Sequence, residues 1–204
     1  MKDTKIKICG LRTPEDIQII NRFRPDFAGF ICCSRFWRFI PKEDLRVLSD
    51  QTDPGIRKVG VFVDDPVEVV SSYIKEGLID LVQLHGREDE SYMERLRKET
   101  GGAPIIKAFR IRHAEDIRAA AASSADYILL DGGQGEGRTF DWSLLDEAGR
   151  DYFLAGGLNP ENIGEAIRRY HPYAVDISSG VETEKHKDAN KVRECIRITR
   201  GGRT

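Results

Sequence analysis

The sequence lacks the features that mark several classes of protein. Its 204 residues include 32 basic and 34 acidic side chains, so the excess positive charge typical of nucleic-acid-binding proteins is absent. No apolar run is long enough to span a membrane, and the first residues, MKDTK, do not begin an apolar signal segment. We therefore expect a protein that binds neither nucleic acid nor membrane and that remains in the cytoplasm.

Cysteine is also scarce. Among Cys9, Cys32, Cys33 and Cys195, no two have the two to four intervening residues of a zinc-binding pattern. Cys32 and Cys33 would point to opposite faces of a strand, which makes them poor disulfide partners. These cysteines fit a reducing compartment, and we expect all but Cys9 to be small buried side chains.

Short β-rich runs alternate with segments of helical periodicity along the chain. We predict strands at residues 5–9, 27–32, 58–63, 81–84, 105–109, 127–130, 152–155 and 174–177. Three helices are expected to start at a capping residue followed by proline, at positions 13–14, 65–66 and 159–160. The second of these helices should cover residues 65–76 and end at Gly77.

Eight strand–helix units predict an α/β fold, a single-domain (βα)8 TIM barrel that spans residues 1–204. The strands are almost entirely apolar, as expected when both faces of a parallel sheet are covered. A doubly wound open sheet is the alternative. It should carry a glycine-rich dinucleotide turn after the first strand, and the CGLR segment at residues 9–12 is not such a turn.

Polar and small residues follow the predicted strands, where barrel enzymes place their reactive groups. Gly156 and Gly157 follow the seventh strand, and Ser178, Ser179 and Gly180 follow the eighth. Free backbone N–H groups and hydroxyls at these two positions predict a phosphate site. The alternative is that the glycines only permit tight turns.

Cys9 and Asp131 are candidates for proton transfer because Cys9 ends the first predicted strand and Asp131 directly follows the sixth. A thiol acts as a base at neutral pH only if positive charge lowers its pKa, and a carboxyl acts as an acid only if its pKa is raised. The alternatives are a buried core thiol for Cys9 and a capping or loop-bracing carboxylate for Asp131.

Seven motifs, in order, resemble those of the phosphoribosylanthranilate isomerase family. They are KICGL at 7–11, GVFV at 60–63, QLHG at 83–86, LLDGGQG at 129–135, FDW at 140–142, LAGGL at 154–158 and VDISSGVE at 175–182. The resemblance implies a (βα)8 barrel that performs an Amadori rearrangement in tryptophan biosynthesis, without metal or organic cofactor, as a monomer or homodimer. It converts N-(5'-phosphoribosyl)anthranilate, a small-molecule substrate, to 1-(2-carboxyphenylamino)-1-deoxyribulose 5-phosphate.

The resemblance also implies residue roles. Cys9 would be the general base, Asp131 the general acid, and Arg38 the partner of the anthranilate carboxylate, which a guanidinium can bind in bidentate fashion. His85 is expected to have a structural hydrogen-bonding role rather than a catalytic one. The chain departs from the family pattern at Cys32 and Phe36, where an aromatic residue and a serine are usual, and at His186, where glycine is usual.

Two other functions remain open from the sequence. A phosphoribosyl isomerase of histidine biosynthesis performs the same rearrangement, but its first-strand base is an aspartate and it has two phosphate sites. A non-catalytic barrel that binds phosphosugars or a partner protein would explain the altered second loop. Cys9 and the single set of phosphate loops argue against the first alternative, and the presence of both Cys9 and Asp131 argues against the second.

Overall fold

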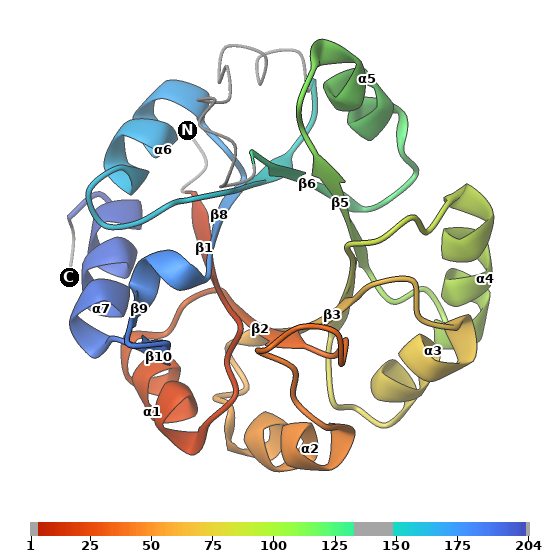
Figure 1. Cartoon of the computed structure of the whole chain (residues 1–204), viewed down its shortest axis with the longest axis horizontal. Coiled ribbons are helices and arrows are strands. Elements are labelled where there is room, and N and C mark those ends of the chain that lie inside the picture. The colour runs from red at the N-terminus through yellow and green to blue at the C-terminus, as the bar shows by residue number, and fades with distance from the viewer. Residues whose placement is uncertain (1–3, 133–148, 203–204) are drawn as a thin grey trace.

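The computed structural model describes residues 4–132 and 149–202. Eight parallel strands form a closed barrel in chain order, with β8 hydrogen-bonded to β1 (Figure 1). The predicted barrel is confirmed, and the open-sheet alternative is wrong. The strands are β1 Lys5–Cys9, β2 Phe27–Ile31, β3 Arg57–Phe62, β4 Leu81–Leu84, β5 Ile105–Arg110, β6 Tyr127–Asp131, β7 Tyr152–Ala155 and β8 Ala174–Ile177.

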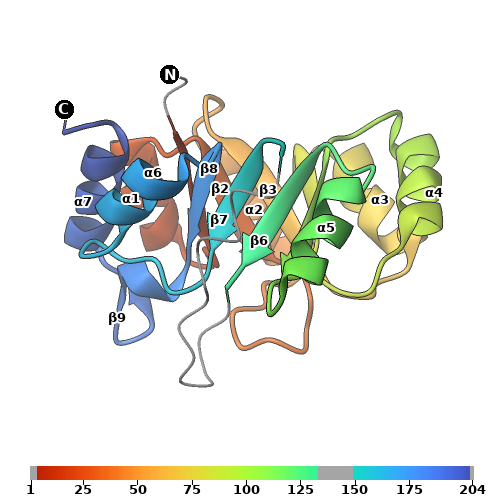
Figure 2. The same cartoon turned by 90° about the horizontal axis from the view of Figure 1, so that it is seen from above.

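Helices surround the barrel (Figure 1). The described part of the chain contains α1 Pro14–Phe23, α2 Lys42–Gln51, α3 Val67–Lys75, α4 Glu90–Thr100, α5 Ala114–Ala122, α6 Ile163–Tyr170 and α7 Ala189–Thr199. Between β8 and α7 lie a short 3-10 helix, η2 Ser179–Val181, and the antiparallel pair β9 Glu182–Thr183 and β10 His186–Lys187. Figure 2 shows β9 and the loop after β2 projecting from the same side of the barrel. No helix in the described ranges is long and apolar enough to cross a membrane.

Strand residues alternate between two apolar clusters. One fills the barrel interior and includes Phe27, Leu81, Ile106, Leu129 and Phe153. The other lies between the barrel and its helices. Because side chains alternate along a strand, residues two positions after an interior residue also face inward. This alternation directs polar residues near the strand ends toward the mouth of the barrel.

One of the three predicted helix starts is confirmed in detail. Thr13 accepts a hydrogen bond from the Asp16 backbone N–H, and the Asp16 carboxylate accepts one from Thr13 in return. Asp65 does not cap α3, because its carboxylate instead accepts from the Val63 N–H and the helix begins at Val67.

The third start is displaced by three residues. Asn159 accepts hydrogen bonds from the N–H groups of Glu161 and Asn162, which forms a turn before α6 begins at Ile163. Asparagine favours such local turns as strongly as it favours caps, so the motif alone does not fix the first helical residue.

Candidate active site

Cys9 is the last residue of β1, and its side chain is almost completely buried, with 6% of the residue exposed. The strand pairing places it opposite Gly29 of β2. A Cβ atom on Gly29 would lie 2.7 Å from the Cys9 Sγ and 3.0 Å from the Lys7 Nζ. Both atoms therefore use the space that glycine leaves open, and the Lys7 ammonium is close enough to act electrostatically on the thiol.

Lys7 lies two residues before Cys9 on β1, so both side chains are on the same face of the strand, and Lys7 is fully buried. Its Nζ donates to both carboxylate oxygens of Asp176 on β8, at 3.0 and 2.9 Å. Burial alone would lower the pKa of Lys7, but the charges of Asp176 and Cys9 outweigh burial and hold that pKa above its ordinary value. The side chain is therefore a permanent cation inside the barrel.

A thiol that acts as a base at neutral pH needs a lowered pKa, and in the chain alone the pKa of Cys9 is not lowered. Burial raises the pKa of Cys9 above its ordinary value of 9.0. Lys7 opposes this rise, Asp176 adds to it, and Lys187 opposes it. In the chain alone the thiol form of Cys9 is thus favoured. The positive charges of Lys7 and Lys187 would stabilise the thiolate once it forms.

Asp131 is the last residue of β6 and lies in register with Ala155 of β7. Its Oδ2 is 3.6 Å from Nε2 of His85, which follows β4. The other ring nitrogen of His85, Nδ1, is 3.3 Å from the amide nitrogen of Gln83. Cys9 and Asp131 therefore share the carboxyl-terminal rim of the barrel, where the sequence places them. Gly133 to Gly135 and the FDW motif at 140–142 lie outside the described residues.

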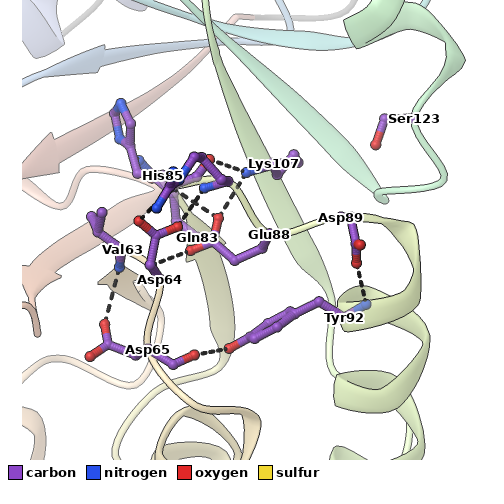
Figure 3. Close-up of polar contacts among 12 residues, drawn as sticks. Val63, Asp64, Asp65, Gln83, His85, Glu88, Asp89, Tyr92, Lys107 and Ser123 are labelled. Atoms are coloured by element: carbon purple, nitrogen blue, oxygen red, sulfur yellow. Dashed lines mark hydrogen bonds and ion pairs between the residues drawn. The ribbon is translucent and has the colours of Figure 1, made fainter.

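A buried ion pair, Lys107–Glu88, holds the loop that carries His85 (Figure 3). Lys107 donates to the Gly86 carbonyl oxygen at 2.7 Å and to Glu88 at 2.8 Å. Glu88 in turn accepts from the N–H groups of Gly86 and Asp64. These contacts hold the backbone on both sides of the turn, so His85 has a defined position at the rim.

Arg38 reaches the rim from the loop after β2, but its guanidinium is already paired. Its Nε and Nη2 donate to the two carboxylate oxygens of Glu182 at 2.9 and 2.7 Å. Glu182 also accepts from Lys187 at 2.7 Å, and Arg38 stacks over the Trp37 ring at 4.1 Å. One bidentate edge of Arg38 is thus occupied by Glu182, and only the other edge is available for a bidentate bond to a ligand.

The two predicted phosphate loops meet at the rim. A Cβ on Gly180 would overlap the carbonyl oxygen of Leu158, so the loop after β8 packs directly on the loop after β7. Gly156 and Gly157 have φ values of 103° and 67°, which glycine adopts without strain. Ser178 and Ser179 precede and begin η2. This loop geometry is compatible with a tight turn and also with an anion site.

The remaining cysteines are free and buried, as expected from the sequence. Cys32 is the first residue after β2 rather than its last, although its N–H still donates to the carbonyl oxygen of Val61 on β3. Within residues 4–132 and 149–202, no group of three or more His, Cys, Asp or Glu side chains could hold a metal ion.

Several polar residues at the site were not singled out from the sequence. They are Lys7, Gln83, Asp176, Glu182 and Lys187, all with close contacts to the candidate residues. A signal for Lys7 and Asp176 exists, because Asp176 is the one charged residue of β8 and Lys7 lies between two isoleucines in the middle of β1. Lys187 offers no such signal, since its contact with Glu182 depends on the turn between β9 and β10.

The closed barrel and its polar carboxyl-terminal rim define a (βα)8-barrel enzyme. The family model described as "N-(5'phosphoribosyl)anthranilate (PRA) isomerase" matches residues 6–197. The chain belongs to this family. It is an isomerase of tryptophan biosynthesis.

The individual relatives agree with the family match. The N-(5'-phosphoribosyl)anthranilate isomerase of Endomicrobium trichonymphae is 45% identical over 96% of this chain and 98% of its own. A phosphoribosyl anthranilate isomerase crystallised with reduced 1-(o-carboxyphenylamino)-1-deoxyribulose 5-phosphate is 33% identical, with a TM-score of 0.86 and coverage of 97% and 99%. Monomers generated from the dimeric enzyme of Thermotoga maritima show the same identity, TM-score and coverage.

Proposed function

We propose that residues 1–204 form one catalytic domain that isomerises N-(5'-phosphoribosyl)anthranilate with Cys9 as general base and Asp131 as general acid. The observation that carries this assignment is the position of the two groups on one rim, with Cys9 beside two lysines and Asp131 facing His85. A cytoplasmic location and a monomeric or homodimeric state complete the proposal.

The reaction needs one acid and one base. Asp131 donates its proton to the ring oxygen of the aminosugar, the bond between C1 and that oxygen breaks, and the nitrogen lone pair forms a C1=N iminium. The Cys9 thiolate then removes the C2 proton, and the electrons of that C–H bond neutralise the iminium to give an enolamine. Tautomerisation moves the remaining hydroxyl proton to C1 and produces the ketone.

The raised pKa of Cys9 fits this order of steps. Burial favours the thiol in the chain alone, but ring opening creates a positive charge on the substrate nitrogen next to C2. A cation close to a thiol lowers its pKa. Lys7 and Lys187 add their own positive charges, so the thiolate is most stable when the iminium that it must deprotonate is present.

Three further contacts hold the substrate. The loops that contain Gly156, Gly157, Ser178, Ser179 and Gly180 would bind the phosphate through backbone N–H groups and hydroxyls. The edge of Arg38 that Glu182 does not occupy would bind the anthranilate carboxylate, and Trp37, which stacks on Arg38, lies beside the place where the anthranilate ring would lie. Arg38→Ala should therefore weaken binding of a carboxylate-bearing product analogue.

The test compares Cys9→Ser and Asp131→Asn with Cys195→Ser, a matched cysteine variant in α7, in a fluorescence assay of freshly generated phosphoribosylanthranilate. The two site variants should lose roughly 10²- to 10⁴-fold in kcat, as expected for removal of a general base or acid. All three proteins should still bind the reduced product analogue by calorimetry. Wild-type turnover by Cys9→Ser or Asp131→Asn would refute the corresponding role.

A further inference from the structure

Gln83 is a buried amide in the barrel interior. It lies on β4 two residues after Leu81, which belongs to the interior apolar cluster, and only 1% of the residue is exposed. Its side-chain nitrogen contacts Nδ1 of His85 at 3.3 Å. Among the described residues its carbonyl oxygen Oε1 has no hydrogen-bond partner. An unpaired buried carbonyl oxygen costs free energy, so an apolar side chain at this position would make the fold more stable. The amide at position 83 therefore calls for a functional explanation.

Within residues 4–132 and 149–202, the one hydrogen-bond partner of the Gln83 amide is the His85 ring, which faces Asp131. The backbone that carries the ring is held in place, because Lys107 and Glu88 hold the adjacent turn (Figure 3) and the His85 N–H donates to the Phe62 carbonyl oxygen at 2.9 Å. One ring nitrogen is therefore directed at Gln83 and the other at Asp131. In neutral imidazole one of these nitrogens carries the proton and the other accepts.

We propose that Gln83 is a positioning residue that sets the tautomer of His85, with the ring proton on Nε2 and directed at Asp131. With the amide nitrogen toward Nδ1, that ring nitrogen accepts, and the proton must reside on Nε2. The imidazole then donates to the carboxylate that Asp131 becomes after it has protonated the substrate.

The unpaired Oε1 gives the amide a second function. If the amide turns by 180°, Oε1 accepts from Nδ1–H, and Nε2 becomes an acceptor that favours the protonated form of Asp131. The first orientation is favoured while Asp131 is a carboxylate, because only the Nε2–H tautomer can donate to that carboxylate, and the second is favoured only while Asp131 is protonated. Gln83 and His85 can therefore follow Asp131 through both protonation states, and this part of the inference rests on the proposed role of Asp131 as general acid.

The tautomer is measured directly by nitrogen-15 NMR of histidine-labelled protein at pH 8, where an ordinary imidazole is neutral. The chain has only four histidines, and a His85→Asn sample assigns the signal. Wild-type protein should show His85 with a protonated Nε2 and an unprotonated Nδ1. Gln83→Met, which keeps the volume and removes the amide, should show a mixture of tautomers.

Kinetics separate this role from a packing role. Gln83→Met should lower kcat roughly five- to tenfold, the usual effect of one hydrogen bond, with KM within about twofold. Leu81→Met, on the same strand and face, is the control and should leave both the tautomer and kcat unchanged.

Two outcomes would overturn the inference. One is a His85 signal that is identical in wild type and Gln83→Met, and the other is wild-type kcat for Gln83→Met. An active Asp131→Asn enzyme with the expected tautomer change would instead refute the general-acid assignment and leave Gln83 as the residue that orients His85.

Discussion

The Lys7–Asp176 pair allows a prediction whose magnitude follows from burial. The side chains of the two residues are 0% and 8% exposed, and two hydrogen bonds of 3.0 and 2.9 Å join them. Removing one partner of such a pair leaves an uncompensated charge and typically costs about 3–5 kcal/mol. Lys7→Met should therefore lower the midpoint of thermal unfolding by roughly 6–20 °C, since each kcal/mol corresponds to about 2–4 °C in a chain of this size.

Replacing both charges should restore stability but not activity. In Lys7→Met/Asp176→Val no charge remains buried without a partner, and replacing a buried ion pair by apolar groups is often neutral or stabilising. Removing Asp176 lowers the pKa of Cys9, but removing Lys7 raises it by more, because Lys7 has the larger effect of the two. Turnover at neutral pH should fall about tenfold for each unit by which the thiol pKa rises further.

The assay is a double-mutant cycle measured by urea unfolding and by initial rates. The surface pair Lys98–Glu94, whose side chains are 72% and 68% exposed, is the matched control, and Lys98→Met should change stability by less than about 1 kcal/mol. If Lys7→Met unfolds within about 1 kcal/mol of wild type, the pair is not a desolvated one. If the double variant is stable and fully active, Lys7 does not assist Cys9.

Other predictions concern individual residues of the rim. Gly180→Ala would force its Cβ against the Leu158 carbonyl oxygen. Calorimetry should show that this variant binds inorganic phosphate or the reduced product analogue at least roughly tenfold more weakly. The control is Gly77→Ala, whose Cβ would have no atom within 4 Å, and it should leave the affinity unchanged. Burial alone would raise the pKa of Glu182, but Arg38 and Lys187 together hold it below its ordinary value of 4.5. The stability that this depressed pKa supplies should be complete above about pH 4.5 and be lost as pH falls through the folded-state pKa. In urea unfolding, the difference between Glu182→Gln and wild type should therefore be largest at about pH 6 and shrink as the pH is lowered below 4.5; a difference that does not change with pH would contradict this. Carbon-13 NMR of the Cys9 Cβ, assigned with Cys9→Ser, should show a thiol that titrates above pH 9.0, and a thiolate at pH 7 would refute the dominance of burial.

The barrel was predictable because its signal is repeated. Each of the eight runs contains β-branched or aromatic residues, and a single error in one run would not change the architecture. Helix starts depend on fewer contacts. The Thr13 capping box formed as predicted because both partners lie within three residues of each other, whereas Asp65 bonded to Val63 in preference to α3.

The candidate site divides in the same way. Cys9 and Asp131 are located by the ends of their strands, which the apolar runs mark. The environment of each residue depends on partners far away in the chain, such as Lys187 for Cys9 and His85 for Asp131. Glu182 is the clearest case, because nothing local indicates that its carboxylate occupies one edge of Arg38, 144 residues earlier. The candidate residues can therefore be located at the rim from the sequence, but the side chains that surround them cannot.

The pairing of β1 with β8 has a consequence for how activity appears during synthesis. Lys7 and Asp176 are direct register partners across this junction, so the first strand and the last strand share one buried charge pair. When only β1 through β7 have emerged from the ribosome, the nascent chain still lacks Asp176, whose carboxylate holds Lys7 beside the Cys9 thiol. Closure of the barrel and formation of the charge pair beside Cys9 are therefore one event, so if Cys9 is the base, turnover reports that β8 has docked.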